Sequence, residues 1–239
     1  VLLQTTMGAV AVTDQAIINE AHERGMVVPN RKQQLTDDNT QAAGAYVAYP
    51  KKGMSEWIGS VDINSLYPSA IRAMNMGPET VIGQLRPIMT DRYIKEKIAK
   101  GASFAAAWEG LFGSLEYTAV MEQQRGTELT VDWQDGETNV YSASEMWAIV
   151  FDSNRPWILT ANGTILTYEK EGIIPGLLKR WYSERKEMQA KKRDAKDKKE
   201  EAFWDKRQLV KKINLNSLYG AILNPGCRFF DHRIGQSTT

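Results

Sequence analysis

One acidic residue after an apolar run is the first feature of this chain that could do chemistry. It is Asp62, in the sequence D-I-N-S-L-Y-P of residues 62–68. We expect residues 58–63 to form a buried strand and Pro68 to open the following helix, where a missing N–H needs no partner. Asp62 would then offer a hard anionic oxygen to a metal ion, and the amides ahead of the helix would face a phosphate. The alternative is an aspartate that only serves a turn.

A second polar pattern lies far downstream, in the sequence K-I-N-L-N-S-L-Y-G of residues 212–220. Lys212, Asn216 and Tyr219 are four and three residues apart, so a helix would place them on one face. Because this second polar pattern is present, we favour a functional role for Asp62 over that of a turn residue.

Helices are expected on both sides of the first stretch. Asp14 can cap a helix that has Ile17 on its apolar side and ends at Gly25. Another helix follows Pro68 and must stop before the Gly-Pro pair at residues 77–78.

Strand signals occupy the middle of the chain. Turn pairs at Asp135-Gly136 and Asn162-Gly163 are flanked by β-rich runs, which predicts two hairpins. Ser142 is expected to cap a short helix, with Glu145 completing a capping box. A strand at residues 44–47 and a helix at about residues 91–100 are also expected.

A long helical stretch begins near Gly172 and Pro175, with Leu177 and Trp181 on its apolar side. Between residues 191 and 201 nearly every residue is charged, and no Gly or Pro marks a turn. Periodicity therefore leaves open whether one helix continues here or two antiparallel helices meet at a charged tip.

Length and composition indicate a folded protein but leave its partners open. The chain has 239 residues, 42% of them hydrophobic, and a formal charge of +1 from 30 Lys and Arg against 29 Asp and Glu. Such a balance neither favours nor excludes an anionic partner. No stretch has membrane-spanning length, and the lone Cys227 is typical of a reducing compartment. Because the chain opens at Val1 without a methionine, we expect a piece of a longer polypeptide.

The two polar stretches resemble the first two polymerase signatures of family B DNA polymerases. They appear here as D-x-x-S-L-Y-P and K-x-x-x-N-S-x-Y-G, in this order and with a basic helix between them. Three flanking patterns are similar to the T-even-type bacteriophage replicative branch: S-L-Y-P-S-x-I-R, the spacing of Gly172, Pro175 and Arg185-Lys186, and R-F-F-D. The resemblance is thin between about residues 85 and 154.

The resemblance implies an α+β fold, a palm segment with an antiparallel helical fingers hairpin. On this basis residues 1–33 form a connecting segment. Residues 34–171 form a palm segment that carries the first signature and an insertion at about residues 86–154. Residues 172–224 form the fingers helices with the second signature, and residues 225–239 begin the return to the palm.

The same resemblance implies a metal and phosphate site. Asp62 would bridge two Mg²⁺ ions in the complete enzyme, and the backbone carbonyl of Ile63 would be a further ligand. Arg185 and Lys212 would hold the triphosphate of the incoming nucleotide, and Asn216 would add a hydrogen bond. The backbone amides of Ser65 and Leu66 would complete this triphosphate site.

Further roles follow from the family pattern. Tyr67 would lie under the sugar and leave no room for a 2′-hydroxyl, while Tyr219 and Gly220 would lie beneath the nascent base pair. Family members place a basic residue four positions after the phosphate-binding arginine, but this chain has Gln189 there. We therefore expect Lys192, one turn later, to supply a phosphate contact.

The implied activity is that of a DNA-dependent DNA polymerase that adds deoxynucleotides to a primer 3′ end. Its partners would be primer–template DNA, deoxynucleoside triphosphates, and a sliding clamp and other replication proteins reached through other regions, with no membrane. It would act in the cytoplasm of an infected bacterial host. The family's second metal carboxylate comes from a later D-T-D signature, and no D-x-D follows Gly220. We therefore expect this chain alone to be inactive.

Two alternatives remain. One is a non-catalytic nucleic-acid-binding module that grips the backbone with its basic helical hairpin, with Asp62 as a turn residue. The other is an RNA-synthesising relative, which Tyr67 argues against. Mg²⁺-dependent nucleotide binding would separate a polymerase from a binding module.

Overall fold

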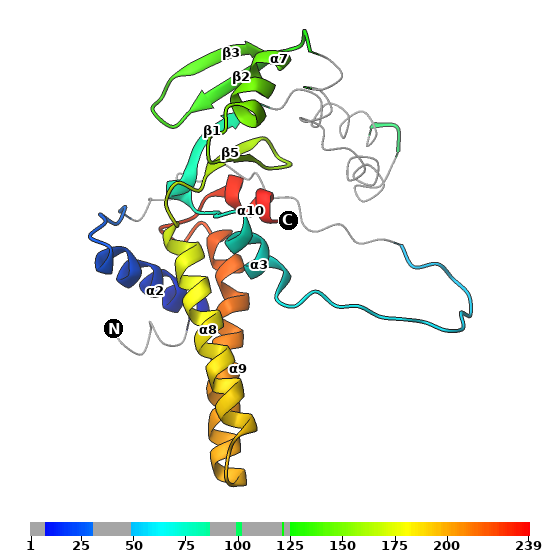
Figure 1. Ribbon diagram of the computed structural model, residues 1–239, viewed down its shortest axis with the longest axis vertical. Helices are drawn as coiled ribbons and strands as arrows, with labels where there is room; N and C mark the ends of the chain where they lie inside the picture. Colours follow the sequence, from blue (N-terminus) through cyan, green and yellow to red (C-terminus); the bar gives the residue numbers. More distant parts are fainter. Residues whose placement is uncertain (1–7, 31–48, 87–98, 102–120, 122–124) are drawn as a thin grey trace. The chain divides into compact units, whose positions relative to one another are not determined.

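The computed structural model describes residues 8–30, 49–86, 99–101, 121 and 125–239 (Figure 1). These residues combine α-helices with an antiparallel sheet, in agreement with the expected mixed fold. The chain divides into two compact units. Unit 1 holds the described parts of Val1–Ala42, Asn64–Thr80 and Tyr168–Thr238, and unit 2 holds those of Ala43–Ile63 and Val81–Thr167.

Unit 2 is built on a five-stranded antiparallel sheet. Its strands are β1 (Val81–Leu85), β2 (Glu128–Trp133), β3 (Thr138–Ser142), β4 (Trp157–Leu159) and β5 (Thr164–Thr167). Their order in space is β3-β2-β1-β5-β4. In the centre, Gly83 of β1 lies opposite Trp133 of β2. A Cβ at Gly83 would come 2.9 Å from the Trp133 ring, so only glycine leaves room for this indole.

Both predicted hairpins are confirmed. The turn between β2 and β3 contains Gly136 with φ 93°, and the turn between β4 and β5 contains Gly163 with φ 81°. Glycine reaches this left-handed region without the steric cost that a Cβ brings. The local turn residues therefore explain the register of both strand pairs.

A short helix, α7 (Ala143–Trp147), follows β3 and begins with the predicted capping box. The Ser142 hydroxyl accepts a hydrogen bond from the Glu145 amide at 3.3 Å, and the Glu145 carboxylate accepts one from the Ser142 amide at 2.7 Å. The Ser142 amide, and after it the Ser142 hydroxyl, which donates to the same carboxylate at 2.8 Å, hold the pKa of Glu145 below its ordinary value. A single turn of π-helix, Ala148–Asp152, continues α7.

The apolar core of unit 2 draws on the sheet and on α7. The expected insertion at residues 86–154 supplies β2, β3 and α7, so much of it is part of this core. The core consists of the buried residues Leu85, Met121, Leu129, Val131, Ala143, Met146, Val150 and Ile165.

Unit 1 is dominated by two long helices, α8 (Ile173–Arg193) and α9 (Lys198–Ile222), which lie side by side (Figure 1). Residues 194–197 join them, so the charged stretch forms the tip of a hairpin. Of the two arrangements that periodicity leaves open, the antiparallel pair is therefore the correct one. The Asp197 carboxylate accepts hydrogen bonds from two amides in the first turn of α9, at 2.8 Å each. This cap starts the second helix without a Gly or Pro.

Three shorter helices pack near the base of this hairpin: α2 (Ala9–Glu23), α3 (Leu66–Ala73) and α10 (His232–Thr238). A 3₁₀ turn, Pro78–Thr80, follows α3. Burial in the two long helices is confined to the basal half, where the buried residues are Ile173, Ile174, Pro175, Gly176, Leu177, Leu178 and Trp181 on α8 and Leu215, Leu218, Ala221 and Ile222 on α9. Apolar packing therefore holds the base, while polar pairs join the distal halves.

The prediction that Asp14 caps a helix is wrong. Helix α2 begins at Ala9, and Asp14 lies inside it. Its carboxylate accepts hydrogen bonds from the Arg228 backbone amide at 2.9 Å and from Arg228 Nε at 3.2 Å. Because this partner lies 214 residues away in sequence, local patterning cannot reveal it. The buried Ile17 and the end of the helix before Gly25 (φ 67°) agree with the prediction.

The prediction of a buried strand over residues 58–63 is also wrong. The segment has no strand, and Ile58, Val61 and Ile63 are 78%, 97% and 63% exposed. A strand needs a neighbour that takes up its backbone hydrogen bonds. None of the five described strands pairs with this segment. Asp62 therefore lies in an exposed irregular segment.

Two other expectations fall largely outside the described residues: the strand at residues 44–47 and the helix at about residues 91–100. In the part of the chain that is described, no helix is long and apolar enough to cross a membrane.

Candidate functional site

The start of α3 carries the second half of the first signature. Ser65 precedes the helix with φ 55° and ψ 54°, and its hydroxyl makes no capping hydrogen bond. The sequence predicts that Pro68 opens this helix; it is the third helical residue, still in the first turn, where its missing N–H needs no partner. The first amides of a helix have no intrahelical acceptor. Because Ser65 does not cap them, the amides at this helix start are available to an anion.

The two signatures meet through their tyrosines. Tyr67 of α3 stacks on Tyr219 of α9, with ring centroids 4.2 Å apart and planes at 13°. Both rings are half-buried. The sequence separates them by about 150 residues, and only the packing of α3 on α9 brings them together. This stack is a direct contact between the two motifs in unit 1.

The polar residues of the second signature lie on α9 as the spacing predicts. Lys212 and Asn216 are exposed and Tyr219 lies one turn further on the same face. A Cβ at Gly220 would meet no other atom of the described chain within 4 Å. Packing within the chain therefore does not require a glycine at this position, and its open surface can receive a flat ligand.

Arg185 and Lys192 lie two turns apart on α8, and each contacts α9. Arg185 Nε donates a long hydrogen bond to Gln208 Oε1 at 3.4 Å. Lys192 Nζ forms an ion pair with Asp205 at 2.7 Å. This hydrogen bond raises the pKa of Lys192 and lowers the pKa of Asp205. A phosphate would therefore compete with Asp205 for Lys192. The spacing of basic residues on α8 does not reveal that Asp205 is a partner of Lys192.

The predicted metal ligands are assigned to the other compact unit. Asp62 and Ile63 are exposed and belong to unit 2, while the other predicted site residues belong to unit 1. Within the described residues, no group of three or more His, Cys, Asp or Glu side chains gathers to hold a metal ion. Asp62 and the carbonyl of Ile63 are hard oxygen donors, which suit Mg²⁺, but they are only part of a two-metal ligand set.

Asn75 and Glu79 link the base of α8 to the segment after α3, a role that no motif in the sequence predicts. Asn75 Nδ2 donates to the Lys170 carbonyl at 2.8 Å, and Asn75 Oδ1 accepts from the Gly172 amide at 2.8 Å. Glu79 Oε1 accepts from the Ile173 amide at 2.5 Å. Asn75 has φ 52° just after a helix end, and an asparagine at such a position is the signal that could have found it.

Comparison with known proteins gives a consistent family. The model of DNA polymerase family B matches residues 4–239. The DNA-directed DNA polymerase of Escherichia phage RB69 is 23% identical over 99% of this chain and 26% of the relative. That of Enterobacteria phage T4 is 35% identical over 37% of this chain and 10% of the relative. A DNA polymerase of Pyrococcus glycovorans is 25% identical over 93% of this chain and 20% of the relative.

Among solved structures, the family B DNA polymerase from Pyrobaculum calidifontis has a similar fold. The TM-score is 0.54 at 17% identity, over 97% of this chain and 22% of that one. The chain thus spans about a quarter or less of the length of these relatives.

Proposed function

Because the chain belongs to DNA polymerase family B, we propose that it is the part of a DNA-directed DNA polymerase that binds the incoming nucleotide for addition to a primer 3′ end. The observation that carries this proposal is the stack of Tyr67 on Tyr219, which joins the two signatures at 4.2 Å. A binding module without a nucleotide site has no need to unite these two motifs.

In this proposal the α8–α9 hairpin is the fingers, and the segment with Asp62 belongs to the palm. The fingers hold the triphosphate. Arg185 binds phosphate oxygens through its guanidinium fork, Lys212 acts as a point charge, and Asn216 donates a hydrogen bond. Exposure of Lys212 and Asn216 on one face of α9 supports these roles. The uncapped start of α3 supports a further phosphate contact through the amides of Ser65 and Leu66.

Tyr67 discriminates against ribonucleotides. Its ring is held by the stack on Tyr219, so it cannot swing away from a sugar placed above it without breaking that contact. Such aromatic pairs contribute roughly 0.5–1.5 kcal/mol beyond their burial. The space beside the Gly220 Cα, where a Cβ would meet no other atom of the described chain within 4 Å, leaves room for the nascent base pair.

Two Mg²⁺ ions supply the charge neutralisation for phosphoryl transfer when bound. Asp62 and the Ile63 carbonyl are the residues of this chain that would hold them, and a second carboxylate must complete the set. Primer–template DNA and deoxynucleoside triphosphates are the proposed substrates, and a sliding clamp is a proposed partner of the complete protein. The phage relatives support action in the cytoplasm of an infected bacterium.

The test uses the complete polymerase that contains this segment. Tyr67→Ala should admit ribonucleotides while deoxynucleotide incorporation falls less, and Tyr67→Phe should keep the discrimination because it keeps the ring. The measurement is single-turnover incorporation of matched ribo- and deoxynucleotides at fixed salt. Equal discrimination in Tyr67→Ala and the parent enzyme would remove the gate role.

A companion measurement addresses the triphosphate site. The nucleotide dissociation constant should rise more in Arg185→Ala than in Lys192→Ala, because Asp205 already engages Lys192. Loss of the half-exposed Lys192 contact should raise the dissociation constant only modestly, because exposed charged contacts contribute little. An unchanged constant for Arg185→Ala would contradict the triphosphate assignment.

The basic hairpin also favours a second candidate, a module that only grips nucleic acid backbone. The polymerase and the binding module differ in whether nucleotide binding depends on a metal ion. Nucleotide binding by the complete protein that strengthens on adding Mg²⁺ supports the polymerase, while Mg²⁺-independent binding of nucleic acid without nucleotide binding supports the module.

A further inference from the structure

Arg72, in the last turn of α3, makes a contact to which the proposed function assigns no role. Its guanidinium carbon lies 4.9 Å from the centroid of the Tyr182 ring on α8. Both side chains are half-buried, and Arg72 forms no ion pair with any residue of the described chain. A guanidinium that is partly removed from water needs a compensating partner. The π face of Tyr182 is such a partner.

This contact joins α3 to the helix that carries Arg185. Tyr67, five residues before Arg72 on α3, stacks on Tyr219 of α9. Helix α3 therefore contacts both long helices, each of them through an aromatic ring (Figure 1). The stretch that begins with the first signature is thus linked to α8 as well as to the second signature on α9.

Helical register places Tyr182 next to Arg185. The two residues are three positions apart on α8, so their side chains are neighbours on its surface. Among the described residues, Arg185 is held by a single long hydrogen bond, from its Nε to Gln208 Oε1 at 3.4 Å. Such a bond restrains the guanidinium weakly. The direction in which Arg185 points therefore depends on the orientation of α8 itself.

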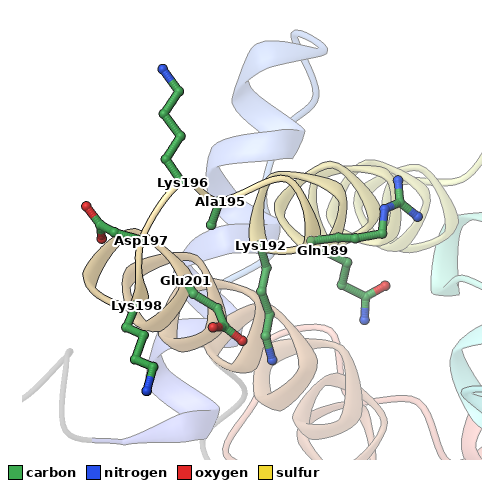
Figure 2. A pocket seen from close by; sticks show the side chains of 8 residues that line it. Gln189, Lys192, Ala195, Lys196, Asp197, Lys198 and Glu201 are labelled. Atoms are coloured by element: carbon green, nitrogen blue, oxygen red, sulfur yellow. The ribbon is translucent and has the colours of Figure 1, made fainter.

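The tip of the hairpin does little to fix that orientation. Gln189 and Lys192, one and two turns beyond Arg185, line an open hollow of about 470 Å³ (Figure 2). Lys192 is paired with Asp205, but this ion pair is partly exposed, and exposed pairs contribute little to stability. The orientation of α8 at Arg185 therefore depends on contacts nearer the base.

Two contacts near the base hold α8 from opposite sides. On one side Arg72 packs on Tyr182. On the other side the Glu184 carboxylate pairs with Lys211 Nζ of α9 at 2.5 Å. Tyr182 and Glu184 are two residues apart, which corresponds to about 200° around a helix. Rotation of α8 about its axis would therefore disturb both contacts.

Small rotations of α8 would matter for the triphosphate site. With its side chains, an α-helix has a radius of about 5–6 Å, so a rotation of about 10° moves its surface by about 1 Å. Misplacement of a group at an active site by about 1 Å can lower the rate by about a hundredfold. Even a partial loss of orientation at Arg185 should therefore be measurable.

We propose that Arg72 is a positioning residue, which fixes the orientation of α8 through Tyr182 and so presents Arg185 to the triphosphate of the incoming nucleotide. This role rests on the proposed function, because that function assigns the triphosphate to Arg185. Arg72 does not itself contact the nucleotide. The planar guanidinium and the aromatic ring are the properties that matter, because they form the contact between α3 and α8.

The experiment is single-turnover incorporation of dATP and of ATP by the complete polymerase that contains this segment, at fixed salt. The test variants are Arg72→Ala and Tyr182→Leu, and Tyr182→Phe keeps the ring. The matched control is Arg207→Ala. Arg207 lies 4.6 Å from the Phe203 ring within α9, so this change removes an arginine–aromatic contact that does not join α3 to α8. Circular dichroism checks that each variant is folded, and Arg72→Gln takes the place of Arg72→Ala if the alanine variant is not.

Arg72→Ala and Tyr182→Leu should each raise the dATP dissociation constant about threefold to tenfold, the range for loss of a partly buried cation–π contact. Tyr182→Phe and Arg207→Ala should change it by less than about twofold. The preference for dATP over ATP should stay within about twofold of that of the parent enzyme, because Tyr67 keeps its stack on Tyr219. A general loosening of unit 1 would instead lower the affinity and this preference together, and that result would overturn the positioning role.

Double mutants test the route from Arg72 to Arg185. Contacts that act in series are not additive. Arg72→Ala should therefore add less than about twofold to the dissociation constant of the Tyr182→Leu or the Arg185→Ala enzyme. Additive effects with Tyr182→Leu, or an Arg207→Ala effect equal to that of Arg72→Ala, would overturn the proposal. A rise in Arg72→Ala without a rise in Tyr182→Leu would also overturn it and assign Arg72 to a direct phosphate contact.

The Arg185→Ala enzyme separates this role from the proposed function. If Arg185→Ala weakens dATP binding and Arg72→Ala does not, the positioning role fails while the triphosphate assignment stands. If Arg185→Ala leaves the dissociation constant unchanged, the triphosphate assignment fails and the positioning role fails with it.

Discussion

Replacement of Asn75 should loosen the base of the α8–α9 hairpin. Asn75 is 7% exposed and has φ 52°. Its amide group bridges the Lys170 carbonyl and the Gly172 amide, both at 2.8 Å. Gly172 is the residue that precedes α8, so this side chain, together with Glu79, positions the start of the long helix. Asn75→Ala removes both hydrogen bonds and leaves two backbone groups without that partner.

The magnitude follows from two contributions. Each of the two hydrogen bonds contributes about 1 kcal/mol net, and a buried group left unsatisfied costs more. Alanine in the left-handed region adds about 1 kcal/mol, because its Cβ crowds the following carbonyl while asparagine is better tolerated there. We expect Asn75→Ala to lower the free energy of unfolding of unit 1 by about 3 kcal/mol, which corresponds to roughly 6–12 °C in the melting midpoint.

Asn154→Ala is the matched control. Asn154 also has a left-handed backbone, with φ 51°, but it is exposed and lies in unit 2. Its replacement should show the backbone cost alone, about 1 kcal/mol. Thermal unfolding gives the total effect, and native-state hydrogen exchange at Gly172 and the first turn of α8 gives the local one. If the two variants lose equal stability, or if exchange at Gly172 is unchanged in Asn75→Ala, the anchoring role is refuted.

Three further predictions concern other polar contacts. The bidentate hydrogen bonds of Arg86 hold the pKa of Asp132 at about 2, below an ordinary value of 3.8, so this pair should stabilise the fold above about pH 4 and cease to do so as the pH falls through about 2. Arg86→Gln should raise the Asp132 pKa toward its ordinary value in an NMR titration, and an unchanged pKa would contradict this cause. Asp14→Ala should cost about 2 kcal/mol in denaturant unfolding, because it strips the Arg228 amide and guanidinium of their acceptor, and a loss below about 0.5 kcal/mol would refute that role. Ser142→Ala should cost about 1 kcal/mol and speed hydrogen exchange in the first turn of α7, whereas unchanged exchange would show that the capping box contributes nothing there.

Short-range features of this protein follow from its sequence. The turns at Gly136 and Gly163, the capping box of Ser142 and the helical face of Lys212 and Asn216 are all predicted and observed. Each depends on backbone sterics or hydrogen bonds between residues a few positions apart, so the information lies within one window of sequence. The family is also evident from two short signatures, because each signature is a set of residue types at fixed local spacing.

The contacts between distant segments required the tertiary structure. No local sequence pattern indicates the stack of Tyr67 on Tyr219 or the burial of Asp14 against Arg228. The exposure of residues 58–63 has no local signature either. Aromatic rings and carboxylates are compatible with many environments, and an apolar run becomes a strand only when another strand pairs with it. The partner of each side chain depends on how helices pack across more than 100 residues of intervening chain. The whole packed unit determines these contacts, because no single segment contains both residues of the pair.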